Sequence, residues 1–321
     1  MFTHNHKEKD YSSHGHVHGT VDATLASTEQ GIRAIKWSFV GLFITALLQV
    51  VVVIYSGSVA LLADTIHNIG DAVTAVPLLI AFKLLTRKPT KRFSYGYGRV
   101  EDLAGVFIVL IILISAIVAG YESIDRLIHP VEMKNVWAVI GASIIGFIGN
   151  EAVAILRIRT GKKMNSAALV ADGYHARVDG LTSLAVLLGA IGVWLGYPLA
   201  DPIIGLLITI TILKIVWDSG KTIFNRLIDG VDPDVIDEIR HAVNHVQSVK
   251  EITEVRARWS GHQLIAELNI AVDSRLSVSE GHEVAVAVRN ELLGYLRYLS
   301  NVVIHVDPVH ASGEQYHSNG N

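Results

Sequence analysis

The chain has 321 residues, of which 50% are hydrophobic and only 18% charged, and its formal net charge is −3. This composition, with a positive mean hydropathy, is unusual for a soluble globular protein of this length. The absence of cysteine excludes disulfides and thiolate metal sites. No basic cluster has the interleaved aromatic residues typical of nucleic-acid binding, so no nucleic-acid partner is expected.

The first residues, MFTHNHKEKDYSSHGHVHG, are polar and rich in histidine, without the apolar core of a signal peptide. We expect residues 1–30 to form a disordered cytoplasmic tail. A His-rich tract fits loose capture of metal ions. A flexible tail without that role fits the same composition.

Long apolar runs follow, each near the roughly 20 residues that a helix needs to cross a bilayer. They predict six transmembrane helices in a domain over residues 31–226, at 37–55, 59–85, 100–124, 136–156, 167–195 and 203–223. Basic residues gather after the second and fourth runs, which places those loops and both termini in the cytoplasm. The prediction is a multi-pass protein of a lipid bilayer, in a bacterial inner or plasma membrane.

From about residue 233 the pattern changes. VIDEIRHAVNHV and residues 279–296 show the apolar spacing of amphipathic helices, whereas ITEVRARW, LIAELNIAV and NVVIHVDP read as strands. We therefore predict a cytoplasmic α+β domain over residues 227–308 with the ferredoxin-like order αββαβ and one sheet face covered by helices. Residues 309–321 are expected to be a second disordered tail.

Two of the apolar stretches carry the same ionisable pattern, LLADTIHNIGD and LVADGYHARVD. The residues are Asp64, His67 and Asp71 in the first and Asp172, His175 and Asp179 in the second. At these spacings each set lies on one face of its helix. An aspartate at the centre of a membrane helix costs about 2.5 to 3.5 kcal/mol. Both faces must therefore meet a polar interior rather than lipid.

A divalent cation held between the two helices would relieve the crowding of like charges. One histidine nitrogen and one carboxylate oxygen from each helix make a four-coordinate shell suited to Zn²⁺. Spacing alone does not select four ligands from six candidates, because the other two aspartates can orient the imidazoles or cap a turn. Interhelical hydrogen bonds or a proton relay without metal are the alternatives.

The motifs GSVALLADTIHNIGD and ADGYHARVDGLTS, the six apolar runs and the terminal VVIHVDP together resemble the cation diffusion facilitator family of proton-coupled divalent-metal exporters. The resemblance covers about residues 30–308. It implies a homodimer with a transport site of His67, Asp71, His175 and Asp179. Asp64 and Asp172 then take supporting roles.

The resemblance also bears on the loop after the second run. Arg99 in that loop and Asp229 after the last run match positions that, in the family, form a charge interlock between protomer halves; solvated surface charges are the alternative. Some members hold a second metal in this loop, but Phe93 and Tyr97 stand here where histidines would be needed. We predict no metal at that position.

In the cytoplasmic domain, His282, His305 and Asp307 match part of a zinc cluster that the family places at its dimer interface. Thr253 and Asn269 replace two further histidines found in some relatives. The resemblance thus implies a single Zn²⁺ rather than a binuclear cluster, with His262 or a water as a fourth ligand.

The predicted function is proton-coupled antiport of Zn²⁺ by alternating access, not an enzymatic reaction. The residue types leave Cd²⁺, Co²⁺, Fe²⁺ and Mn²⁺ open as cargo, because geometry and supply decide among such ions. Two other functions remain open at this point. One is an intramembrane metal-dependent hydrolase, and the other is a metal sensor that transports nothing.

Overall fold

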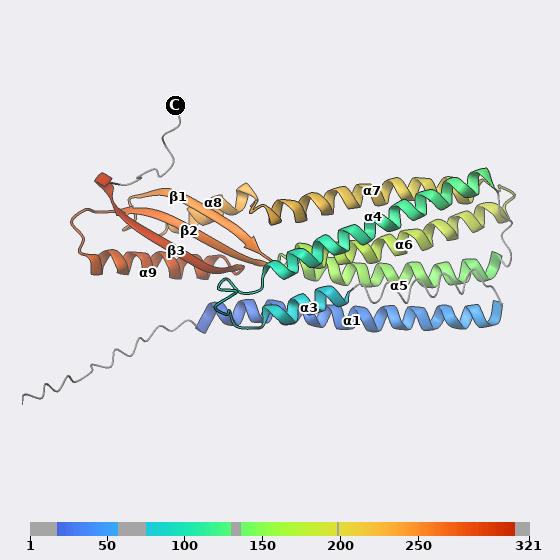
Figure 1. Cartoon of the computed structure of the whole chain (residues 1–321), viewed down its shortest axis with the longest axis horizontal. Coiled ribbons are helices and arrows are strands. Elements are labelled where there is room, and N and C mark those ends of the chain that lie inside the picture. Colours follow the sequence, from blue (N-terminus) through green and yellow to red (C-terminus); the bar gives the residue numbers. More distant parts are fainter. Residues whose placement is uncertain (1–17, 57–74, 130–135, 198, 312–321) are drawn as a thin grey trace, which may run out of the picture.

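A computed structural model describes residues 18–56, 75–129, 136–197 and 199–311 (Figure 1). The first part is a bundle of long helices, and a small domain with a sheet lies at one end of it. The bundle helices in the described part are α1 His18–Ser56, α3 Val76–Leu85, α4 Arg99–Ile128, α5 Val136–Lys163, α6 Ala167–Trp194 and α7 Ala200–Leu227.

Five helices of the described part are long and apolar enough to cross a membrane: α1 (within Ala26–Val52), α4, α5, α6 and α7. Their large apolar side chains point outward at many positions, as at Ile114 and Ile210, where lipid would surround them. The shorter α3 is the described part of the second predicted span, and residues 59–74 of that span lie outside the description. The chain is therefore a multi-pass membrane protein.

The N-terminal boundary of the bundle differs from the prediction. Helix α1 begins at His18, whereas residues 1–30 were expected to be a disordered tail. The stretch ATLASTEQGIRAIKW has three alanines and one each of leucine, glutamate, glutamine, arginine and lysine, all of which favour a helix. Only residues 1–17 of the expected tail lie outside the description.

Helices α5 and α6 form a closely packed hairpin. Ser166 caps α6, because its Oγ accepts a hydrogen bond from the Leu169 N–H at 3.0 Å. On the facing surfaces, a Cβ atom added to Gly161 would lie 2.8 Å from the backbone nitrogen of Val170. Small residues allow such an approach between membrane helices, and it brings polar side chains of the two helices within reach of each other.

The sheet domain contains α8 Pro233–Val243, β1 Glu251–Ser260, β2 Gln263–Val272, α9 Val278–Tyr295 and β3 Leu299–Pro308, followed by the short 3-10 helix Val309–Ala311. The predicted order αββαβ is confirmed. Strand β2 lies in the centre of the sheet, antiparallel to β1 and parallel to β3, because α9 carries the chain across between the last two strands. Helices α8 and α9 share one apolar core with the sheet, around Ile239, Leu268 and Val288.

A capping box begins α9. The Glu280 carboxylate accepts from the Ser277 N–H at 2.7 Å, and Ser277 Oγ accepts from the Glu280 N–H at 3.3 Å. The backbone N–H and hydroxyl of Ser277 hold the pKa of the Glu280 carboxyl below its usual value. This start signal fixes where the crossover helix begins.

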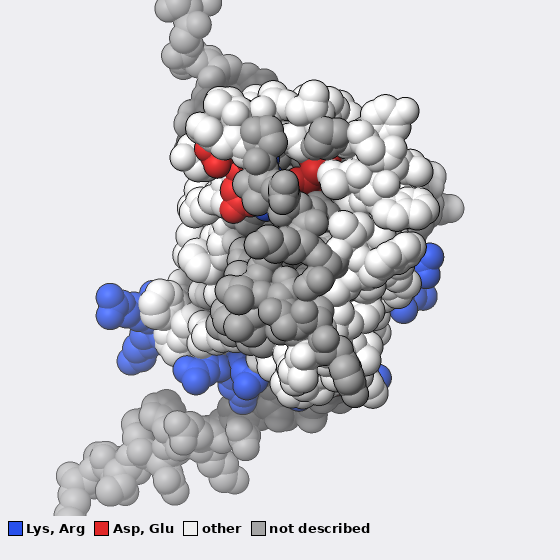
Figure 2. Space-filling model, turned by 90° about the vertical axis from the view of Figure 1, so that its right-hand side faces the viewer, with Lys and Arg blue, Asp and Glu red and all other residues white. Residues whose placement is uncertain are grey.

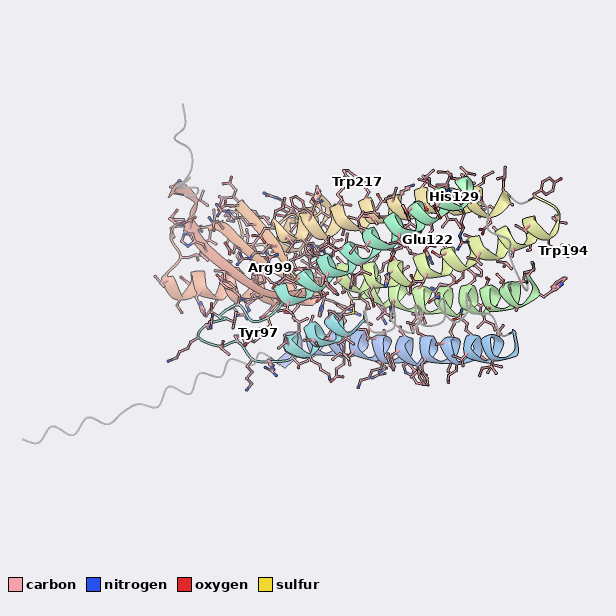
Figure 3. All side chains as sticks on the ribbon, turned by 45° about the vertical axis from the view of Figure 1, so that its right-hand side comes forward. Tyr97, Arg99, Glu122, His129, Trp194 and Trp217 are labelled. Atoms are coloured by element: carbon pink, nitrogen blue, oxygen red, sulfur yellow. The ribbon has the colours of Figure 1, made fainter. Side chains whose placement is uncertain are left out.

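The opposite end of the bundle is sparsely charged. Figure 2 looks onto that end, where apolar and neutral residues predominate and acidic side chains form a small group. Trp194 lies at the tip of α6 there (Figure 3), with its ring 5.7 Å from that of Trp137 at the start of α5. Amphipathic indoles favour the headgroup region of a bilayer.

Candidate metal centre

Helix α6 carries half of the predicted transport site inside the bundle. His175 is 1% exposed and Asp179 10%, and His175 Nε2 lies 4.0 Å from Asp179 Oδ2. The four-residue spacing thus brings both side chains to one buried face, as predicted. The other half of the site, His67 and Asp71, and its neighbour Asp64 lie outside the described residues. The joint four-ligand shell therefore stays a prediction.

Asp172, expected to support an imidazole or cap a turn, faces a different partner. Its Oδ2 lies 3.2 Å from Nη1 of Arg157 on α5, and both side chains are buried. Arg157 belongs to the basic residues after the fourth apolar run, for which a loop is predicted, but α5 continues to Lys163. The missed signal is spacing, because Val153, Ala154, Arg157 and Ile158 all fall on one buried stripe of α5.

A second interhelical ion pair lies nearby on the same two helices. Arg177 of α6 donates to both carboxylate oxygens of Glu151 on α5, at 3.1 Å from Nε and 2.6 Å from Nη2. Both side chains are about one-third exposed. Two parallel hydrogen bonds hold the two side chains in one relative orientation. The pair therefore favours one rotation of α6 about its axis, and this rotation decides where His175 and Asp179 point.

Arg99 and Asp229 pair within one chain, whereas the interlock implied by the resemblance joins protomer halves. Arg99, at the first position of α4 in Figure 3, donates from Nη2 to Asp229 Oδ1 and from Nη1 to the Arg226 carbonyl, the latter at 2.7 Å. Asp229 lies in the turn after α7 with a positive φ of 63°. The pair ties the first turn of α4 to the connection between the two domains.

A buried polar junction, which the sequence analysis did not foresee, lies beside this interlock. We define the junction as Glu101 and Asp102 of α4 with Gly261 and His262 of the β1–β2 turn. Glu101 Oε2 accepts from the His262 N–H at 3.1 Å and lies 2.7 Å from His262 Nδ1, and Asp102 Oδ2 accepts from the Gly261 N–H at 3.1 Å. The turn of the sheet domain is thereby anchored to the membrane helices.

The junction rules out one role considered for His262. Its ring nitrogens face Glu101 and, at 3.1 Å from Nε2, Thr28 Oγ1 of α1, and its side chain is 2% exposed. It therefore does not complete a cytoplasmic zinc site. His305 Nε2 lies 2.9 Å from Asp307 Oδ1 on β3, as the alternation of the strand predicts.

The exposed His282 on α9 does not join the pair formed by His305 and Asp307. Within the described part of one chain, no three His, Asp or Glu side chains are close enough to hold a metal ion. A zinc site built from His282, His305 and Asp307 consequently requires a second protomer or a change of shape.

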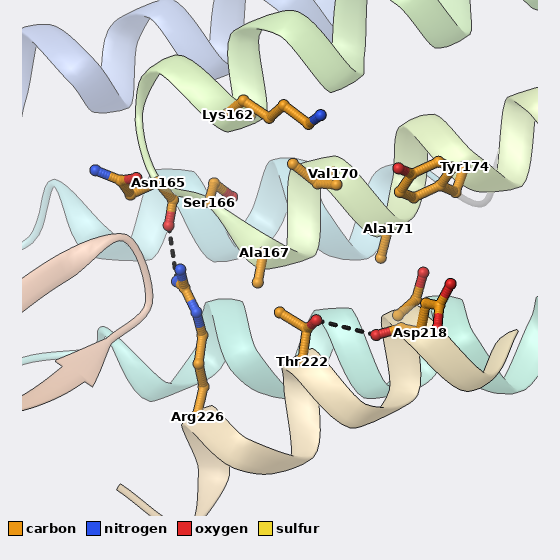
Figure 4. A pocket seen from close by; sticks show the side chains of 12 residues that line it. Lys162, Asn165, Ser166, Ala167, Val170, Ala171, Tyr174, Asp218, Thr222 and Arg226 are labelled. Atoms are coloured by element: carbon orange, nitrogen blue, oxygen red, sulfur yellow. Dashed lines mark hydrogen bonds between the residues drawn. The ribbon is translucent and has the colours of Figure 1, made fainter. Parts of the chain in front are cut away.

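A cavity of about 330 Å³ opens between the α5–α6 turn and α7 (Figure 4). Ala167 and Ala171 line it from α6, and Asp218, Thr222 and Arg226 face them from α7. Ala167, Ala171 and His175 are four residues apart, so they follow one line along the helix. The cavity therefore lies on the side of α6 that carries the predicted metal ligand.

We expect Tyr97→Ala to leave the number of bound metal ions unchanged. Tyr97 lies in the loop before α4 (Figure 3), and its ring packs on Phe93 at 5.1 Å, which is an apolar contact rather than a ligand pair. Elemental analysis of the purified variant, with His175→Ala as the variant expected to lose metal, measures this directly. Loss of one ion per chain from Tyr97→Ala would contradict it.

Two family models match the chain. The cation efflux transmembrane domain matches residues 35–228, and the cytoplasmic domain of cation efflux proteins matches residues 231–309. These matches cover the helical bundle and the sheet domain respectively.

Two relatives and one solved structure resemble all or part of the chain. A probable cation efflux system protein of Mycobacterium tuberculosis is 51% identical over 299 residues, which cover 93% of this chain and 90% of the relative. The manganese efflux system protein MneP of Bacillus subtilis is 28% identical over 261 residues, or 78% of this chain and 87% of MneP. A solved cadmium form of the MamM C-terminal domain is 28% identical, with a TM-score of 0.23, and covers 24% of this chain and 95% of that one. The chain belongs to the cation diffusion facilitator family of cation efflux transporters.

Proposed function

We propose that the protein is a proton-coupled antiporter that exports divalent transition-metal ions, Zn²⁺ first among them, through a site of His67, Asp71, His175 and Asp179. The observation that carries this proposal is the buried pair of His175 and Asp179 on α6. An imidazole and a carboxylate on one buried helix face are half of a tetrahedral N₂O₂ shell. Cargo passing through a cation efflux transporter would need such a site.

Proton coupling would follow from the chemistry of the imidazoles. A histidine must be neutral to ligate a metal, so binding from the cytoplasm displaces protons. With an unperturbed pKa near 6.5, His67 or His175 would regain a proton on the more acidic side and weaken the shell. The inward proton gradient would then drive metal outward, with helix groups rocking about the site.

The cavity between α6 and α7 supports access from the cytoplasm. It lies at the end of the bundle nearest the sheet domain, and its α6 wall leads along Ala167 and Ala171 toward His175. Basic loops at that end agree with cytoplasmic placement of both termini. We further propose that the cytoplasmic domain pairs two protomers, and that His282, His305 and Asp307 meet across that contact.

The identity of the metal needs a panel of ions, because a relative named for manganese efflux shares 28% of the aligned residues. The full-length protein in liposomes should accumulate Zn²⁺ when the lumen is more acidic than the outside, since protons leaving the lumen would exchange for metal. Collapsing the gradient with an ionophore should abolish that accumulation. Cd²⁺, Co²⁺, Fe²⁺ and Mn²⁺, tested as competitors, rank the cargo.

Each contrary result has a distinct meaning. Flux that ignores the pH gradient would remove proton coupling but keep transport. Turnover of a peptide or lipid without cation flux would indicate an intramembrane hydrolase. Metal bound by the cytoplasmic domain, with no flux of any ion, would indicate a sensor.

A further inference from the structure

Arg157 is the only lysine or arginine that is fully buried in the described part of the chain. It lies on α5, 1% exposed, opposite Asp172 of α6, which is 0% exposed. Its guanidinium stays charged in a protein, and an isolated charge in such surroundings is strongly unfavourable. The ion pair of 3.2 Å between Nη1 and Asp172 Oδ2 compensates both charges.

The backbone geometry keeps this pair together. A Cβ atom on Gly173 would lie 2.6 Å from Ile158 Cγ1, 2.9 Å from the Ile158 nitrogen and 3.1 Å from Arg157 Cβ. The backbones of α5 and α6 thus approach closely beside Asp172. At this distance even the short aspartate side chain reaches the guanidinium of Arg157. Arg157 Nη1 also lies 3.5 Å from the Asp172 carbonyl oxygen.

Asp172 occupies a position from which it could compete for metal. It is three residues before His175, on the same face of α6 and at the same depth of burial. A third carboxylate in a site for divalent cations adds charge and a ligand, and the ligand charge sets how tightly such sites hold an ion. A transport site must release its ion at each cycle, so an additional carboxylate would slow export.

We propose that Arg157 is a positioning residue that withholds Asp172 from the metal, so that α6 offers only His175 and Asp179 to the cargo. To bind a cation, Asp172 would have to leave a buried guanidinium, and breaking a buried pair is strongly unfavourable. This inference rests on the proposed transport site. It assigns a role to Arg157, and it makes Arg157, rather than an imidazole, the partner of Asp172.

The test compares full-length Arg157→Gln, Asp172→Asn, the double variant and Arg159→Gln in liposomes that have an acidic lumen and are supplied with external Zn²⁺, as above. Arg159 is an exposed residue two positions further along α5 and is the matched control. We expect Arg157→Gln to lower maximal flux and also the Zn²⁺ concentration for half-maximal flux, each about tenfold, the scale on which outer contacts of metal sites act. The double variant, which has no uncompensated buried charge, should recover flux, and Arg159→Gln should match the unmodified protein.

Zn²⁺ affinity measured in detergent against a chromophoric chelator gives a readout that does not depend on transport. Tighter binding by Arg157→Gln, lost again in the double variant, supports the inference. Unchanged affinity in Arg157→Gln, or a well-folded double variant that stays inactive, overturns it. If Arg157→Gln does not fold, the flux of the double variant decides: recovered flux supports the inference, and its absence in a folded protein overturns it. Absence of flux in the unmodified protein would instead count against the proposed function.

Discussion

Asp179→Asn is expected to reduce metal flux to background in a protein that still inserts and folds. The substitution keeps the size of the side chain but replaces a carboxylate by a neutral amide, which is a poor ligand for Zn²⁺. His175 and the second-span pair would be left with three ligands at most. Asp179 is 10% exposed and lies 4.0 Å from His175, and the amide has nearly the same shape as the carboxylate, so the fold should tolerate the change. Zn²⁺ uptake into liposomes, at saturating metal, measures the loss.

Two further variants make the result specific. Asp125→Asn changes an exposed aspartate of α4, which lies 3.2 Å from the exposed His129, and should transport normally. Asp172→Asn should mainly destabilise the protein, because it leaves Arg157 charged and unpaired; breaking a buried pair costs about 3 to 5 kcal/mol. Thermal unfolding, followed by size-exclusion chromatography, separates that loss of stability from a loss of metal transport. Normal flux in Asp179→Asn together with a stable, inactive Asp172→Asn would mean that the transport carboxylate is Asp172.

Local patterns explain what the sequence predicts well. The apolar runs, the strand alternation of β2 and the His-x-x-x-Asp spacing on α6 all depend on residues a few positions apart. Burial of His175 beside Asp179 follows from that spacing and from the cost of charge in lipid. These features could be predicted without knowing which helices are neighbours.

Contacts between distant segments could not be predicted in the same way. From the sequence alone, Arg157 is one of several basic residues of a predicted loop. Its ion pair with Asp172 becomes apparent only when α5 and α6 are packed together. Glu101 and Asp102 read as a favourable acidic start to α4, yet both are buried under a turn about 160 positions later in the chain. Gly261 and His262 read as an ordinary hairpin turn, and only the docking of the two domains shows why glycine, with a φ of +62°, precedes the histidine.

Glu101→Ala is expected to release the β1–β2 turn from the membrane helices. The Glu101 side chain is 1% exposed. Its carboxylate accepts hydrogen bonds from Ser166 Oγ at 2.5 Å and from the His262 N–H at 3.1 Å, and it lies 2.7 Å from His262 Nδ1. Each buried polar group left without its partner costs about 1 to 3 kcal/mol. Opening of the junction should therefore become at least about tenfold more frequent, since about 1.4 kcal/mol is a factor of ten. Faster hydrogen–deuterium exchange at the Gly261 and His262 amides is the measurement.

Two comparisons show whether the effect belongs to the junction. Glu267→Ala removes an exposed carboxylate from β2 of the same hairpin and should leave exchange at Gly261 and His262 unchanged. Amides in the core of β2, such as Leu268, should stay protected in Glu101→Ala, because the sheet domain keeps its own apolar core under α8 and α9. Gly261→Ala should open the same turn from the other side, since its Cβ would lie 2.5 Å from Glu101 Oε2 and 2.9 Å from the Gly98 carbonyl oxygen. If both variants leave exchange at His262 slow, the buried carboxylate does not anchor the sheet domain, and the interlock of Arg99 with Asp229 would have to hold the two domains together.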